Sequence, residues 1–574
     1  MYFPKSLIIS LSLAIFSLGL SKLLDNSKFH PNGTSRIKIR PILFNCALIL
    51  SGITLSLTRS VEQDSVLSGI VYGGYVVFPE DNLAHSSLTL PTLPTVISSL
   101  WLNNSAAVGI MNYLLTLTGF LIFLYAYFLI LRSFLNPHPQ LILVALVLTI
   151  WNPVYDYFST SYPAVLPGTT TTFGLLGIGL AFLTFSNLLA SNFRSAGIYI
   201  GLLLATHLTY FVMAMFFAAL YLMIQVFFSK DYRSINRFLI GLFPTFLVSV
   251  PLYYNSLPNI QDTAISTSEM TLLKAYLGNL DVHRNPDFNF PRSIPGVITI
   301  LIVLTLVILV HRNFQGISNR ERGILVFLLG FSGVTLISYL AQIMSIKSLS
   351  TGFFNIYMLW RITNLFGLLL SPLLIVALVR VIVHTLEKVH FNFGSSHSLS
   401  RLSKIITIIG FLFLIRTELM GGLDALNGPK HESYGNQKTN NCLSNSKLKV
   451  ALTAPSLSRA ILVNCRQPIL LASALDNIPY ENSKINLYNE VLSNVFNIDM
   501  TNPPNVLLHT ATLSDENLEA LWVNRTRQNW KYLAHRFEFQ EVIVPQTWEN
   551  LALCKVKNSS TQTVFVRYST NSAC

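Results

Sequence analysis

The hydrophobic positions of this chain fall into long, nearly uncharged runs over its first three-quarters, and the pattern changes in the last quarter. Runs such as 6–24, 106–131 and 172–191 hold almost no charged residue. A helix needs about 20 apolar residues to cross a hydrocarbon core of about 30 Å. The pattern therefore predicts an α-helical polytopic membrane region followed by a polar domain.

About twelve transmembrane helices are expected. The stretch 196–228 would be roughly 50 Å long as one helix, which is too long for a single crossing, so we predict a break near His207. The predicted spans are 6–24, 42–58, 106–131, 140–152, 172–191, 196–206, 208–228, 238–254, 295–311, 323–343, 353–379 and 404–420. The first is expected to be a retained helix, because no small-residue cleavage site follows it.

Lysine and arginine alternate between two sets of loops, which predicts the orientation. The poor set holds only Arg59, Lys274, Arg284, Arg292 and Lys347. Cytoplasmic loops carry the excess of basic residues, so the rich set is assigned to the cytoplasm. The rich set comprises Lys22, Lys28, Arg36, Lys38, Arg40, Arg132, Arg194, Lys230, Arg233, Arg237, Arg312, Arg320, Arg322, Arg380, Lys388, Arg401 and Lys404. Both termini, the long loops 59–105 and 255–294 and the shorter loop 153–171 are then expected outside the cytoplasm.

The composition fits a protein of the cell (inner) membrane. Only 11% of the 574 residues are charged, against about 25% in a soluble domain. The net charge of +13 comes largely from short loops, so it reflects orientation and contact with anionic membrane lipids. Nucleic acid is excluded as a partner, and the oligomeric state is left open.

The region after the last span is predicted to form a small extracytoplasmic α/β domain. Residues 1–420 form the membrane domain, 421–447 a polar linker and 448–574 the last domain. Its strand-like runs are 449–452, 460–463, 469–471, 542–544 and 563–568, and its helix-like stretches are 484–496, 513–522 and 526–537. Trp522, Trp530 and Trp548 are expected in its core.

Four of the five cysteines, Cys442, Cys465, Cys554 and Cys574, lie in this polar region. Outside the cytoplasm they would form two disulfides with three possible pairings, and otherwise they would be free thiols. Both alternatives stay open at this stage.

Acidic residues in the outer loops are the candidate catalytic groups. Glu62 and Asp64 directly follow a predicted span. Either carboxylate could act as a general base or bind a divalent cation, Mg²⁺ or Mn²⁺. The alternative is a solvated loop carboxylate. The later part of this loop, 96–102, is apolar enough to lie along the membrane interface.

Aromatic and basic residues supply candidate binding groups. Tyr155 and Tyr157 flank Asp156, and such rings stack on sugars while a carboxylate binds hydroxyl groups, although an aromatic belt predicts the same residues. His207 is either a polar site residue or a helix-breaking turn. Arg361, Arg284 and Arg292 are candidates for binding a diphosphate, with headgroup snorkelling as the alternative.

This layout resembles that of the polytopic GT-C glycosyltransferases. The features that carry the resemblance are the acidic first outer loop with Glu62 and Asp64, the second acidic loop with Asp156, the pair of short spans and the polar C-terminal domain. The resemblance implies a lipid-phosphate-linked sugar donor on the extracytoplasmic face, with Glu62 or Asp64 as the base or metal-site residue. Two departures are the extra span 6–24 and Gln63, which separates the two carboxylates.

The tail also resembles those of bacterial polytopic membrane proteins of uncharacterised function, through segments 466–471, 475–480, 502–504 and 544–548. That likeness assigns no chemistry. The leading interpretation is a glycosyltransferase of cell-envelope polysaccharide assembly. The alternatives are a transporter or flippase of a lipid-linked envelope component, and a non-catalytic membrane scaffold with an outer binding domain.

Overall fold

The computed structural model divides into two compact units, each with its own core. Unit 1 comprises Met1–Glu62, Tyr113–Val250 and Asn289–His431, and unit 2 comprises Gln63–Asn112, Pro251–Phe288 and Glu432–Cys574. The structure describes residues 63–79, 82–88, 92–102, 105–134, 175–254, 266–280, 449–473, 484–504, 512–548, 550–556 and 565–571, with the single positions 49, 53, 327, 330, 333, 334, 336, 337, 340, 442 and 475.

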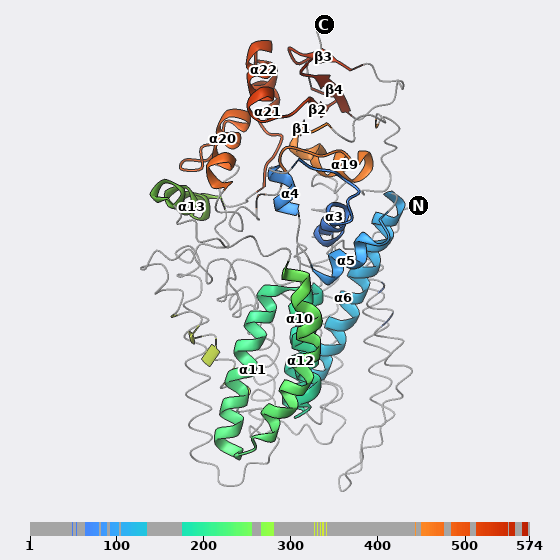
Figure 1. Ribbon diagram of the computed structural model, residues 1–574, viewed down its shortest axis with the longest axis vertical. Helices are drawn as coiled ribbons and strands as arrows, with labels where there is room; N and C mark the ends of the chain where they lie inside the picture. The colour runs from blue at the N-terminus through green and yellow to red at the C-terminus, as the bar shows by residue number, and fades with distance from the viewer. Residues whose placement is uncertain are drawn as a thin grey trace, which may run out of the picture. The chain divides into compact units, whose positions relative to one another are not determined.

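The described part of unit 1 is helical (Figure 1). Its helices are α6 (Ser105–Phe134), which begins in unit 2, α9 (Leu175–Leu189), α10 (Phe193–Thr206), α11 (Leu208–Ser229) and α12 (Arg233–Tyr254). By length and composition, Ala107–Ile130 and Leu208–Phe227 are able to cross a membrane, whereas α9 and α10 are shorter apolar helices. These helices coincide with five of the predicted spans. The total of about twelve stays a prediction, because most of the other spans lie outside the described residues.

The predicted break near His207 is confirmed. Helix α10 ends at Thr206 and α11 begins at Leu208, with His207 between them in an extended conformation (φ −158°, ψ 98°). The continuous apolar stretch therefore forms two helices, as its excess length indicated.

Aromatic packing and close helix contacts hold unit 1 together. The ring of Phe185 on α9 lies 4.8 Å from that of Phe217 on α11, at an interplanar angle of 72°. A Cβ atom at Gly197 of α10 would collide with the main-chain oxygen of Phe238 on α12, so the missing side chain allows the two backbones to touch. Small residues at contacts of this kind are typical of helix packing in membranes.

Unit 2 contains a four-stranded mixed sheet in the order β1-β2-β4-β3. Its strands are β1 (Ala451–Thr453), β2 (Glu541–Pro545), β3 (Cys554–Lys555) and β4 (Phe565–Ser569). The first two are parallel, with Leu452 opposite Val542, and the other pairs are antiparallel. Parallel pairing requires a crossover, and the C-terminal helices lie in the chain between β1 and β2.

The helices of the C-terminal part are α19 (Pro455–Cys465), α20 (Ile485–Phe496), α21 (Leu518–Val523) and α22 (Arg527–Arg536). The α/β class of this part is as expected, but the prediction of a strand at 460–463 is wrong, because these residues lie in α19. Pro455 in the first turn favours a helix start, and a short apolar run alone does not distinguish a strand from a buried helix. The run 469–471 contributes only a bridge between Ala451 and Ile469.

The core of unit 2 is shared between the C-terminal part and segments from far earlier in the chain. The earlier elements of the unit are α3 (Gln63–Tyr72), α4 (Leu83–Leu88), α5 (Leu93–Ser99) and α13 (Thr267–Asn279). Leu83 of α4 and Tyr276 of α13 belong to the same buried cluster as Trp522 and Trp530. Trp548 is also buried there, so the core placement of the three tryptophans is confirmed.

Candidate functional site

Of the residues predicted to supply a catalytic carboxylate, the structure describes only the backbone of Asp64, which is the second residue of α3. An acidic residue in a first turn is also what helix stability alone favours, because the helix dipole is positive there. Glu62, Asp156, Tyr155, Tyr157, Arg361, Arg284 and Arg292 lie outside the described residues. Their roles stay predictions.

His207 has a clear structural role at the start of α11. Its Nδ1 atom accepts a hydrogen bond of 3.4 Å from the backbone N–H of Tyr210, which caps the helix. Its ring lies 4.4 Å from the Tyr210 ring. The capping contact accounts for the residue at this turn, and a contact to substrate remains a prediction.

Arg466 joins the C-terminal part of unit 2 to the end of the α5 segment. The residue follows α19 in the left-handed conformation (φ 50°). Its Nη2 donates a hydrogen bond of 2.8 Å to the main-chain oxygen of Leu102, and its guanidinium lies 5.5 Å from the Tyr75 ring centroid. Burial lowers the pKa of the Arg466 guanidinium from its usual value.

A second contact joins helix α4 to the C-terminal part. Asn82 caps α4 by accepting from the backbone N–H of Ala84, while its side-chain amide donates to the main-chain oxygen of Ile469 at 3.0 Å. Tyr488 of α20 donates to the main-chain oxygen of Leu83 at 3.0 Å. Burial, and secondarily the charge of Lys484, lowers the pKa of His85 on α4.

A third contact fixes α13. The Tyr276 hydroxyl donates to the main-chain oxygen of Leu475 at 2.8 Å. Asn279 donates to the main-chain oxygen of Met500 at 3.0 Å. In each of the three contacts a side chain binds a backbone carbonyl of a remote segment, which defines the relative positions of the segments more closely than apolar contact alone.

The first two of these contacts hold the α3–α5 segment, at whose start Asp64 lies. Gly69 of α3 approaches α5 so closely that a Cβ there would lie 2.6 Å from the Ser98 Cβ. The Tyr75 hydroxyl donates to the main-chain oxygen of Ser99 at 3.0 Å. The C-terminal part of unit 2 is therefore a support for this segment, and a rigid support is what a predicted catalytic carboxylate requires.

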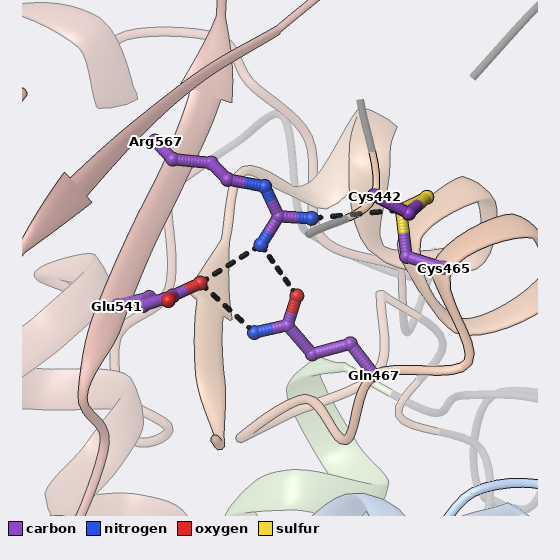
Figure 2. The surroundings of a disulfide bond; sticks show 5 residues. All are labelled: Cys442, Cys465, Gln467, Glu541 and Arg567. Carbon is purple, nitrogen blue, oxygen red and sulfur yellow. Dashed lines mark hydrogen bonds and ion pairs between the residues drawn. A yellow bond between two sulfur atoms is a disulfide. The ribbon is translucent and has the colours of Figure 1, made fainter. Parts of the chain in front are cut away.

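Strands β2 and β4 of the same unit are joined by a buried ion pair. Arg567 of β4 and Glu541 of β2 are 0% and 2% exposed, and their Nη1 and Oε2 atoms are 2.8 Å apart. Gln467 accepts from Arg567 and donates to Glu541, as Figure 2 shows. Removal of one partner would leave the other charge buried and unpaired, so loss of either partner alone is expected to destabilise the sheet.

The same figure shows a disulfide beside the ion pair (Figure 2). Cys442 and Cys465 are bonded, which joins the chain before β1 to the end of α19. Arg567 Nη2 lies 3.5 Å from the Cys465 sulfur. Cys554 is also disulfide-bonded, so three of the four candidate cysteines are not free thiols.

Three carboxylates such as Glu62, Asp64 and Asp156 are the hard oxygen ligands that Mg²⁺ and Mn²⁺ prefer. Of the three, only Asp64 lies within the described residues. Over those residues, no group of three His, Cys, Asp or Glu side chains is placed to hold a metal ion. A divalent cation stays a prediction from the sequence.

Arg466 and the Arg567–Glu541 pair were not among the residues predicted to matter. The pair had one signal in the sequence, because Arg567 interrupts a strongly apolar run and Glu541 begins another. Arg466 had none, because its partner Leu102 is 364 positions away.

No protein-family model matches this chain, and no curated protein matches it. Among solved structures, the chain is similar to an archaeal oligosaccharyltransferase, AglB from Archaeoglobus fulgidus, in complex with an inhibitory peptide and a dolichol-phosphate. The sequence identity is 11% and the TM-score 0.31, over 95% of this chain and 70% of that chain. This is a distant resemblance.

Proposed function

We propose that this chain is a multi-pass membrane protein that transfers a sugar from a lipid-phosphate-linked donor on the extracytoplasmic face, in the assembly of an envelope glycan. One observation carries the proposal. Parts of the predicted outer loops 59–105 and 255–294 share a core with the C-terminal domain. Segments with a common core lie on one side of a bilayer, and the loop charges predict that side to be outside the cytoplasm.

The disulfide between Cys442 and Cys465 supports the same side. Disulfides persist in oxidising compartments and are rare in the cytosol. The outer loops 59–105 and 255–294 and the C-terminal domain would then lie on one face of the membrane.

The chemistry proposed for this face uses the outer-loop carboxylates. Glu62, Asp64 or Asp156 accepts the proton of the acceptor hydroxyl or amide, whose lone pair attacks the anomeric carbon of the sugar. The bond between that carbon and the phosphate oxygen breaks, and the lipid phosphate leaves with the electron pair. Arginines such as Arg361 and Arg284 neutralise the phosphate, because guanidinium binds phosphate oxygens bidentately.

The test is sugar transfer in membranes by single variants Glu62→Ala, Asp64→Ala and Asp156→Ala. Glu516→Ala is the matched control, because Glu516 is an exposed carboxylate of unit 2. Loss of one catalytic base is expected to reduce the rate about 10²–10⁴-fold. Undiminished transfer by all three variants would discard the site.

Activity in detergent separates an enzyme from the alternatives. A purified transferase turns over without compartments, whereas a transporter or flippase does nothing measurable there. A non-catalytic scaffold would tolerate all three carboxylate changes and would transfer no sugar in either setting.

A further inference from the structure

Three apolar side chains at the end of the short helix α5 and in the turn that follows it are exposed, whereas polar side chains of the helix are buried in unit 2. Ile97, Leu100 and Trp101 are 38%, 72% and 65% exposed. They are spaced i, i+3 and i+4, and the backbone N–H groups of Leu100 and Trp101 bond to Ile97 and Ser98, so the helical turn continues to Trp101. The three side chains therefore lie on one face.

The opposite face is polar and buried. Thr95 and Ser98 are fully buried, and Ser99 is nearly so. The Thr95 hydroxyl bonds to that of Thr92 at 3.0 Å, and the Ser99 hydroxyl donates to the main-chain oxygen of Val96 at 2.7 Å. These local bonds satisfy the Thr95 and Ser99 hydroxyl groups, which would otherwise be costly to bury, whereas the buried Ser98 hydroxyl has no hydrogen-bond partner among the described residues. A segment in water has the reverse arrangement, with Leu and Trp inside and Ser and Thr outside.

The position of α5 in the chain indicates what covers its exposed face. Trp101 precedes Ala107, the first residue of a helix stretch able to cross a membrane, by six residues. Six residues span at most about 20 Å, so this face lies close to one end of that helix. Ile110, in the first turns of the same helix, is exposed as well. Tryptophan is enriched at the interface between membrane and water, where its largely apolar ring lies at the level of the lipid headgroups.

We propose that the face formed by Ile97, Leu100 and Trp101 docks into the lipid bilayer surface, with α5 lying in the interface. Arg466 then acts as a positioning residue, because its bond to the Leu102 carbonyl fixes the docked segment to α19. The C-terminal part of unit 2 is thereby linked to the membrane surface through α5. This inference depends on α6 crossing the bilayer, which is part of the function proposed above.

The test places a nitroxide label at three positions of the full-length protein in phosphatidylcholine–phosphatidylglycerol nanodiscs. The variants are Leu100→Cys on the docking face, Leu114→Cys on α6 and Tyr532→Cys on α22. All three side chains are exposed, so the label is tolerated. Unsubstituted protein carried through the same labelling gives the background. The measurement is the ratio of collision rates with oxygen, which partitions into lipid, and with a nickel complex, which stays in water.

The ratio is expected to be at least about threefold higher at positions 100 and 114 than at 532, since the first two lie in lipid and its interface. A ratio at 100 equal to that at 532, with 114 still in lipid, would overturn the docking face and leave the membrane proposal standing. Shielding of position 100 from both agents would also overturn it. If position 100 is shielded, broadening of the nitroxide spectrum by a second nearby label would show that another copy of this chain covers the face. Shielding without broadening would show that a different protein surface covers it. A water-like ratio at 114 would overturn both proposals.

Discussion

The guanidinium of Arg466 donates a 2.8 Å hydrogen bond to the main-chain oxygen of Leu102, across 364 positions of the sequence. This contact joins a predicted outer loop to the C-terminal domain. Unit 2 is therefore assembled from segments that are separated in the sequence by the helices of unit 1. Mutation of Arg466 tests one contact between these segments.

Substitution of Arg466 is expected to loosen the α5 segment. Arg466→Ala removes a charge-assisted hydrogen bond and the contact with Tyr75, which together contribute about 1–3 kcal/mol. Hydrogen exchange of the segment 92–102 is expected to become faster. Arg536→Ala is the control, because Arg536 pairs with Glu490 at the surface, where such pairs contribute little. Equal exchange in the two variants would contradict the role of Arg466.

The buried ion pair predicts a strong asymmetry between single and double variants. Glu541→Gln leaves the Arg567 charge buried without its counter-charge, and we expect a loss of about 3–5 kcal/mol in the free energy of unfolding. The double variant Glu541→Leu with Arg567→Met is expected to be less destabilised, because no charge remains in the core. Thermal unfolding of the purified protein measures both.

Lys449→Ala is the control for the ion pair. Its ammonium group lies 3.5 Å from the same carboxylate, but its side chain is 51% exposed. We expect a loss below about 1 kcal/mol, as for other exposed pairs. A loss as large as that of Glu541→Gln would mean that burial does not control the energetics of this carboxylate.

The disulfide predicts a specific pair of linked peptides. Digestion without reduction is expected to yield one species that joins the peptides of Cys442 and Cys465. Cys442→Ser is expected to lower the free energy of unfolding by about 3 kcal/mol, because the bond closes a loop between residues 23 positions apart and so restricts the unfolded chain. Mass spectrometry that finds Cys465 joined to another cysteine, or both residues alkylated, would refute this pairing.

His85 predicts a pH dependence of stability. Burial and Lys484 lower its pKa in the folded state below the ordinary value of 6.5, so the unfolded state binds the proton more tightly. The contribution of His85 to stability is therefore present above pH 6.5 and is lost as pH falls through 6.5 toward the folded-state value. His85→Gln is expected to flatten the decrease of the unfolding temperature with acidification, whereas a change at the exposed His535 serves as control. An unchanged pH profile in His85→Gln would count against this assignment.

Much of the architecture was predictable from the pattern of apolar residues. The length of the stretch 196–228 required a break, and the structure has it at His207. The apolar run 460–463 predicts a strand when it is considered alone. A run this short fits the two-residue period of a strand and the 3.6-residue period of a helix equally well. Pro455 was the available signal for a helix start.

The candidate site was less predictable, because its contacts join residues that are remote in sequence. The apolar character of 96–102 was visible, but the burial of Thr95 and Ser98 on the other face depends on α3. The pairing of Arg567 with Glu541 depends on the register of β2 and β4, which no local pattern determines. Charge placement, by contrast, is read from the sequence directly, and it alone predicted the side of the membrane.

The proposed function requires the C-terminus to lie outside the cytoplasm. A reporter pair of alkaline phosphatase and green fluorescent protein fused in turn after Cys574 measures this location, because the first matures only outside the cytoplasm and the second fluoresces only within it. We expect active phosphatase and no fluorescence. A fluorescent fusion with inactive phosphatase would place unit 2 in the cytosol and contradict the proposed function.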